Sequence, residues 1–133
     1  MIAVDTNLLI YFYVQGEHSA LAEKTFLKDP HWIAPVLWRS EFLSVLAAGI
    51  KKGIFEFEVA AEIMTEAERL MEGHEYSVSP IAVLRLSSRS RCSSYDCEYV
   101  SLAQELGVPL VTMDEQILAQ FPETAVRPDV FVR

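Results

Sequence analysis

The sequence predicts an α/β fold, a three-layer sandwich in which helices cover both faces of a central parallel β-sheet. Two short apolar runs indicate this, MIAV at the start and VPLVT near the end, because each is β-prone without polar alternation, as in a strand buried on both faces. Helix-like segments alternate with such runs, which is typical of parallel sheets. With 133 residues the chain fits a single domain, residues 1–133.

The first element is a strand that ends at Asp5, and a helix over residues 6–16 follows it. The further predicted helices cover residues 18–28, 36–50, 55–71, 81–86, 95–106 and 115–120, and the further strands residues 32–34, 108–112 and 124–126. Residues 76–78 form either a short strand or a loop, and the serine-rich residues 87–94 a loop or a helix junction. Gly107 marks the end of helix 95–106, because glycine is favoured just after a helix.

The overall composition is that of a globular protein, with 51% apolar and 23% charged residues. No apolar run is long enough to span a bilayer and no signal sequence precedes the first strand, so we expect no membrane association and a cytoplasmic location. Cys92 and Cys97 lack the paired spacing of a zinc site and have no histidine nearby, which favours a reducing compartment.

The net charge of −8 argues against nucleic-acid binding through bulk electrostatics, since such binding depends on clustered lysine and arginine. The charge is unevenly distributed, however. Seven glutamates lie between Glu56 and Glu75 against the single Arg69, which is typical of a solvated helix face. In contrast, the segment from Arg85 to Arg91 holds three arginines and no acid.

Glu41 is an acid at an unexpected place. Its neighbours one helical turn away, Leu37, Trp38 and Val45, are apolar, so the pattern places a carboxylate on the buried stripe of its helix, with Arg39 off that face. An unpaired buried carboxylate costs several kcal/mol unless a metal ion or cationic partner offsets it. The alternative is a glutamate at the edge of the stripe that reaches solvent.

Three aspartates have structural explanations when taken singly, Asp5 and Asp114 as helix caps and Asp96 in a first turn. Together with Glu41 they are better explained as one cluster at the carboxyl ends of the strands, where ligands bind in open α/β sheets. Four acids in one pocket repel each other unless a cation is present. All-oxygen ligation without histidine or cysteine favours Mg²⁺, with Mn²⁺ as a substitute.

These segments resemble PIN-domain ribonucleases of the VapC toxin type: VDTN with Asp5, RSEF with Glu41, and YDCEYVSLAQELGVPLVTMD with Asp96 and Asp114. The resemblance covers essentially the whole chain. It implies a PIN-like fold, a metal-dependent endoribonuclease, a homodimer and a cognate antitoxin that inserts a segment near the acidic pocket. The site residues that it implies are the catalytic and metal-binding quartet Asp5, Glu41, Asp96 and Asp114, with Asn7 and Thr112 as polar neighbours. The family often has small residues after the third acid, where this chain has Cys97 and Glu98, so the role of Glu98 stays open.

The hypothesis is therefore hydrolysis of RNA phosphodiester bonds. Asp5, Asp96 and Asp114 hold one or two Mg²⁺ ions, directly or through water, and Glu41 helps to bind or orient the attacking water. Candidate contacts to the RNA backbone are Lys51, Lys52, Arg85, Arg89 and Arg91. Candidate base-stacking residues are Tyr11, Tyr13 and Trp38, with core packing favoured for Trp38.

Three alternatives remain at this point. Phosphoryl transfer at Asp5 would need a second aspartate two residues on, where the chain has Asn7, or a late lysine, and no lysine follows Lys52. A PIN-like nuclease could also process RNA without any antitoxin. Finally, the acidic helix could serve a non-catalytic binding module, which titration with Mg²⁺ would separate from the enzyme.

Overall fold

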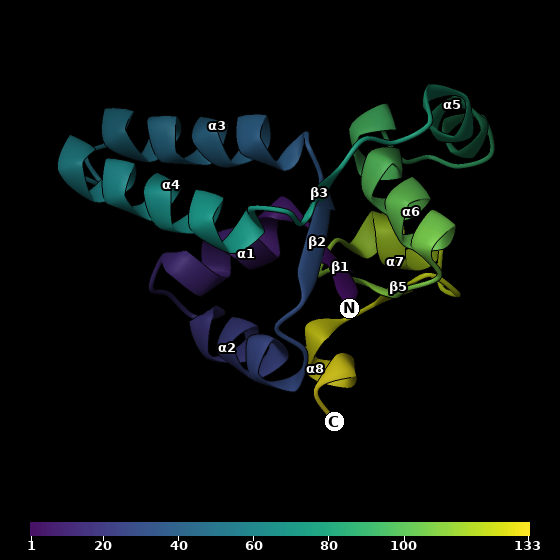
Figure 1. Ribbon diagram of the computed structural model, residues 1–133, viewed down its shortest axis with the longest axis horizontal. Helices are drawn as coiled ribbons and strands as arrows, with labels where there is room; N and C mark the ends of the chain where they lie inside the picture. Colours follow the sequence, from purple (N-terminus) through teal and green to yellow (C-terminus); the bar gives the residue numbers. More distant parts are fainter.

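The structure, a computed structural model, describes all 133 residues and contains one five-stranded sheet with helices on both faces (Figure 1). The elements in chain order are β1 (Ile2–Val4), α1 (Thr6–Tyr13), α2 (Ser19–Lys28), β2 (Trp32–Pro35), α3 (Trp38–Lys51), α4 (Phe57–Met71), β3 (Glu75–Tyr76), α5 (Pro80–Ser88), α6 (Ser94–Leu106), β4 (Leu110–Val111), α7 (Glu115–Gln120), β5 (Ala125–Val126) and α8 (Pro128–Phe131). The predicted α/β fold with a parallel sheet is confirmed.

The strand order is β3-β2-β1-β4-β5, and all neighbouring strands are parallel. The chain builds outward from β1 through β2 to β3, then returns to the other side of β1 to add β4 and β5. The strand order therefore reverses between β1 and β4, which is where ligands bind in such sheets. Val4 pairs with Val111, so the next step of the register brings Asp5 level with Thr112.

The helices form two layers around the sheet. Figure 1 shows α1 to α4 on one side and α5 and α6 on the other. Helix α6 packs directly on β1, β2 and β4, and α5 packs on α6. On the opposite side α4 reaches β2 and α3 packs against both α1 and α4, while the short α8 lies against α2. This arrangement brings the first turns of α1, α3 and α6 to the carboxyl-end edge of the sheet.

The sheet and the helix faces that cover it enclose one hydrophobic core. Ile2, Ala3 and Val4 are buried, as expected for a strand covered on both faces. Trp38 is fully buried as well, which confirms core packing and leaves no ring face for a base. Gly107 ends α6, as predicted, and has a φ of +65°, a left-handed conformation that glycine adopts readily.

The differences from the predicted elements lie mostly at their ends. The uncertain residues 76–78 contribute only the last residue of the two-residue β3, and residues 87–94 contain the end of α5 and the first residue of α6. Helix α8 was not predicted, because its single turn between Pro128 and Phe131 is too short for a periodic pattern. None of the helices has the length and apolar character needed to cross a membrane.

Candidate active site

A cavity of about 280 Å³ opens at the carboxyl-end edge of the sheet. All four predicted acids line it: Asp5 at the start of α1, Glu41 in α3, Asp96 in α6 and Asp114 after β4. The predicted neighbour Asn7 also lines it. Four segments that are remote in sequence therefore contribute acids to one cavity.

Asp5 is the most deeply buried of the four acids, with 8% of its surface exposed. It caps α1, because its Oδ1 accepts a hydrogen bond from the Leu8 amide at 3.0 Å, and its Oδ2 accepts one from the Thr112 hydroxyl. Burial raises the pKa of Asp5 to about 6, and the charges of Asp114 and Glu41 add to this rise, although the two hydrogen bonds oppose it. The site therefore disfavours a charged Asp5 unless a cation is near.

Thr112 connects two of the acids from behind the cavity wall. It is fully buried, donates to Asp5, and accepts a hydrogen bond from the Asp114 amide at 3.0 Å. Asp114 in turn caps α7, since its Oδ1 accepts from the Ile117 amide at 2.9 Å. The cap uses one carboxylate oxygen and leaves the other without a hydrogen bond from the protein.

Glu41 lies at the edge of the buried stripe of α3 rather than within it. The prediction that Val45 continues this stripe is wrong, because Val45 is 38% exposed and lines the cavity. The buried residues of α3 are Trp38, Phe42, Leu46 and Gly49, which recur every three to four residues, whereas the residue one turn after Glu41 is the exposed Val45. The half-buried Glu41 therefore faces the cavity from the rim of the core.

Asp96 lies in the first turn of α6, as predicted. Its amide donates to Ser93 Oγ at 3.1 Å, so Ser93 is the helix cap. Burial raises the pKa of Asp96, and the charges of Asp114 and Glu41 raise it further. The negative charges of two of the other acids therefore act on Asp96.

None of the four acids forms an ion pair within the protein. The cations that pair with acids elsewhere are the N-terminal amine, Arg39, Arg69 and Arg127. Carboxylates without a counter-charge repel each other, which favours a bound cation, and all-oxygen donors of this kind fit Mg²⁺ or Mn²⁺.

The carboxylates do not converge closely enough for direct binding of one ion by three of them. No group of three or more acidic, histidine or cysteine side chains is placed to hold one metal ion directly. Mg²⁺ typically keeps several of its waters, so this donor set fits an ion that is bound partly through water.

Sequence reasoning missed three hydroxyl groups of the cavity, those of Thr6, Ser44 and Tyr99. Thr6 and Tyr99 are buried, and both lie within hydrogen-bond distance of Glu41. The available signal was spacing, because Tyr99 follows Asp96 by three residues and therefore shares its helix face.

Other predicted residues lie away from the cavity. Glu98 lines a separate hollow beside Tyr76 and Val36, and burial, followed by the charge of Glu41, raises its pKa. Lys51 and Lys52 are exposed at the far end of α3. Arg91 is exposed, Tyr11 and Tyr13 are half-buried, and Arg85 and Arg89 line a second cavity of about 390 Å³ between α5 and α6.

Comparisons with known proteins concern the family and the fold of the chain. Residues 2–123 match the family model of the PIN domain. Ribonuclease VapC3 of Pyrobaculum aerophilum is 24% identical over 124 residues, which cover 91% of this chain and 95% of that protein. The crystal structure of PAE2754 from the same organism has a TM-score of 0.77 at 20% identity, covering 98% of this chain and 92% of that one. A toxin-antitoxin complex from Klebsiella pneumoniae has a TM-score of 0.69 at 16% identity, covering 96% and 98%.

Proposed function

The chain belongs to the PIN domain family, and from this premise we propose that it is a metal-dependent endoribonuclease that hydrolyses RNA phosphodiester bonds. One observation carries the proposal: four acids from remote segments line one cavity, and no basic side chain neutralises them. The metal is proposed to be Mg²⁺, with Mn²⁺ as a substitute, because the donors are all oxygen.

Each acid has a proposed role. Asp5, Asp96 and Asp114 would hold one or two Mg²⁺ ions, directly or through water. A bound ion in such a site lowers the pKa of water and stabilises charge on the phosphate oxygens. Glu41 binds or orients the attacking water, and Thr112 fixes the orientation of Asp5 through its hydrogen bond.

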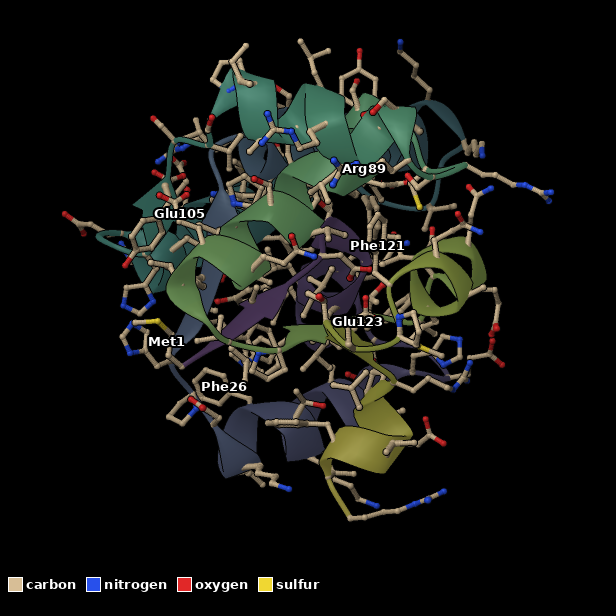
Figure 2. The ribbon with its side chains drawn as sticks, turned by 90° about the vertical axis from the view of Figure 1, so that its right-hand side faces the viewer. Met1, Phe26, Arg89, Glu105, Phe121 and Glu123 are labelled. Atoms are coloured by element: carbon tan, nitrogen blue, oxygen red, sulfur yellow. The ribbon has the colours of Figure 1, made fainter.

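The basic residues of the α5–α6 face are proposed to contact the RNA backbone. Arg85 and Arg89 lie one turn apart, line the same cavity, and form no ion pair within the protein, so their charges are available to phosphates. Figure 2 looks onto this face and shows Arg89 on it, together with Glu105 of α6. Arg91, Lys51 and Lys52 are further proposed contacts, and Tyr11 and Tyr13 are candidates for stacking on bases.

The proposed biological setting is that of a toxin in a type II toxin–antitoxin pair. The relative named Ribonuclease VapC3 and the fold shared with a toxin-antitoxin complex support this proposal. An antitoxin partner and a homodimer are part of it. Light scattering of the purified chain tests the proposed dimer. An adjacent gene for a small DNA-binding protein would support the proposed antitoxin, whereas the absence of such a gene would favour a role in RNA processing.

The central test measures cleavage of single-stranded and structured RNA with Mg²⁺, with EDTA, and in the variants Asp5→Asn and Asp96→Asn. We expect cleavage with Mg²⁺ that EDTA abolishes and that either substitution strongly reduces. Cleavage that persists unchanged in both variants would overturn the assignment of these acids. Isothermal titration with Mg²⁺ separates the enzyme from a binding module, because only the enzyme requires binding that depends on Asp5 and Asp96.

A further inference from the structure

Glu41 is held by two hydroxyl groups that come from two other helices. The Tyr99 hydroxyl of α6 donates to Glu41 Oε1 at 2.6 Å, and Thr6 Oγ1 of α1 lies 2.9 Å from the same oxygen. The two hydroxyl oxygens also lie 2.6 Å from each other. Helices α1, α3 and α6 therefore meet at a single carboxylate oxygen.

Tyr99 is the central member of the group formed by Thr6, Tyr99 and Glu41. This follows from the number of protons available and from the lengths of the three contacts. The two hydroxyl groups supply two protons for three oxygen–oxygen contacts, since an ionised carboxylate only accepts. Both contacts of 2.6 Å include Tyr99, so the shortest path of donation runs from Thr6 to Tyr99 and from Tyr99 to Glu41. Burial raises the pKa of Tyr99 well above its ordinary value, and the hydrogen bond to Glu41 adds to this, so the hydroxyl keeps its proton.

The surroundings keep Tyr99 in place. Only 3% of its surface is exposed, and it is part of the hydrophobic core. It lies one helical turn after Asp96, so the same helix face presents a site acid and the hydroxyl that holds Glu41. Both hydroxyl contacts of the Glu41 carboxylate are made by Oε1, and Oε2 has no hydrogen bond from the protein.

We propose that Tyr99, supported by Thr6, is a positioning residue for Glu41: it anchors Oε1 and thereby leaves Oε2 oriented for the reaction in the cavity. The inference rests on the proposed function, because it assumes that Glu41 acts on water or a cation there. It adds to that function an uncharged residue outside the acidic quartet. Hydrogen-bond partners of this kind orient the groups that bind metals and water, and losing one typically costs roughly 10- to 100-fold in affinity or activity.

The test removes one hydroxyl at a time from the full-length chain. Tyr99→Phe keeps the buried ring and deletes only the donor. Thr6→Val deletes the second hydroxyl, whereas Thr6→Ser keeps it. The matched control is Tyr95→Phe, which makes the same change on the same helix at a side chain that is 59% exposed. Each variant is measured for kcat and KM on an RNA oligonucleotide that the wild type cleaves, for Mn²⁺ affinity by isothermal titration, and for thermal stability.

We expect Tyr99→Phe to lower kcat roughly 10- to 100-fold with little change in KM, or to weaken Mn²⁺ binding by a similar factor. Tyr95→Phe is expected to match the wild type, and Thr6→Ser to recover most of what Thr6→Val loses. The proposal is overturned if Tyr99→Phe keeps both the kcat and the Mn²⁺ affinity of the wild type. It is also overturned if the loss lies entirely in KM, which would make Tyr99 a substrate contact.

The same measurements also decide the proposal if Tyr99→Phe does not fold or if the wild type does not cleave RNA. If Tyr99→Phe fails to fold, the comparison of Thr6→Val with Thr6→Ser decides, by the same measurements. If the wild type cleaves no RNA, the proposed function fails, but Mn²⁺ affinity still tests the positioning role. Weaker binding in Tyr99→Phe than in Tyr95→Phe then supports it, and equal binding overturns it.

Discussion

The molecule has two acidic regions that look alike in composition and differ in their surroundings. Along α4 and up to β3, five glutamates are exposed, and the two that are half-buried, Glu68 and Glu75, both pair with Arg39. In the cavity at the sheet edge, all four acids are buried or half-buried, and none pairs with a cation. In the first region the protein compensates each half-buried charge, and in the second it leaves them uncompensated. The missing counter-charge, rather than the number of acids, therefore identifies the candidate site.

The largest expected effect is on catalysis, and it compares one acid from each region. Asp96→Asn should lower the rate of RNA cleavage on the order of 10²- to 10⁴-fold, because it removes a charge that is proposed to hold the metal and keeps the helix start intact. Glu62→Gln on α4 makes the same chemical change at an exposed position and should leave the rate unchanged. Equal effects of the two substitutions would remove the distinction between the regions.

The second prediction concerns the pH dependence of stability without metal. The pKa of Asp5 is raised from 3.8 to about 6 in the folded state, so the folded state binds more protons than the unfolded state between these pH values. Stability should therefore fall as the pH rises from about 4 to about 6, by up to ~3 kcal/mol from this group.

Asp5→Asn should remove this contribution and stabilise the metal-free chain at pH 7, because asparagine caps a helix as well as aspartate does. Urea unfolding in EDTA at several pH values measures the difference between the two chains. A wild type that gains stability relative to Asp5→Asn as the pH rises through this window would contradict the burial argument. Glu62→Gln should not reproduce the effect.

The third prediction is that a divalent cation stabilises the folded chain through the acids of the cavity and not through the glutamates of α4. At a free Mn²⁺ concentration of 100 times its Kd, binding to the folded state alone adds about 2.7 kcal/mol, which is several degrees in Tm. EDTA should reverse this increase in Tm. The increase should be absent in Asp96→Asn and persist in Glu62→Gln. Thermal unfolding followed by circular dichroism measures it, and an unchanged Tm in the wild type would count against the metal site.

The smallest expected effect is the loss of the compensating arginine. Arg39 donates hydrogen bonds to Glu68 at 2.8 Å and to Glu75 at 2.6 Å, but these groups are partly exposed. Arg39→Ala should therefore lower the free energy of unfolding by about 1 kcal/mol or less. RNA cleavage should not change, since Arg39 does not line the cavity. Denaturant unfolding measures the first outcome. A large loss of activity in a folded Arg39→Ala chain would show that the two regions are coupled.

Much of this architecture could be predicted from local patterns. Uninterrupted apolar runs predict the buried strands. Asp5 and Asp114 follow two of these strands, because each caps the helix that begins there. The positions of Asp96 in a first turn and Gly107 after the same helix follow from equally local rules. Glu41 was recognised through its apolar neighbours, although one of them, Val45, is exposed.

Other features depend on how the helices pack. The contact of Thr6 and Tyr99 with Glu41 joins residues that are 35 and 58 positions away from it, and no local pattern encodes such a distance. The pairing of Arg39 with Glu68 and Glu75 is equally non-local. The extent of convergence is also a tertiary property, because the four acids share a cavity without three of them being placed to hold one ion directly.

The amino-acid sequence by itself determined the alternation of strands and helices, the caps, and the identity of the acids, because these follow from side-chain periodicity and hydrogen bonding over a few residues. Only the tertiary structure decided which acids lack a counter-charge and which oxygen of Glu41 is held. The physical reason is that burial and electrostatic pairing depend on distances across the fold, and the packing of α1, α3 and α6 around the sheet sets those distances.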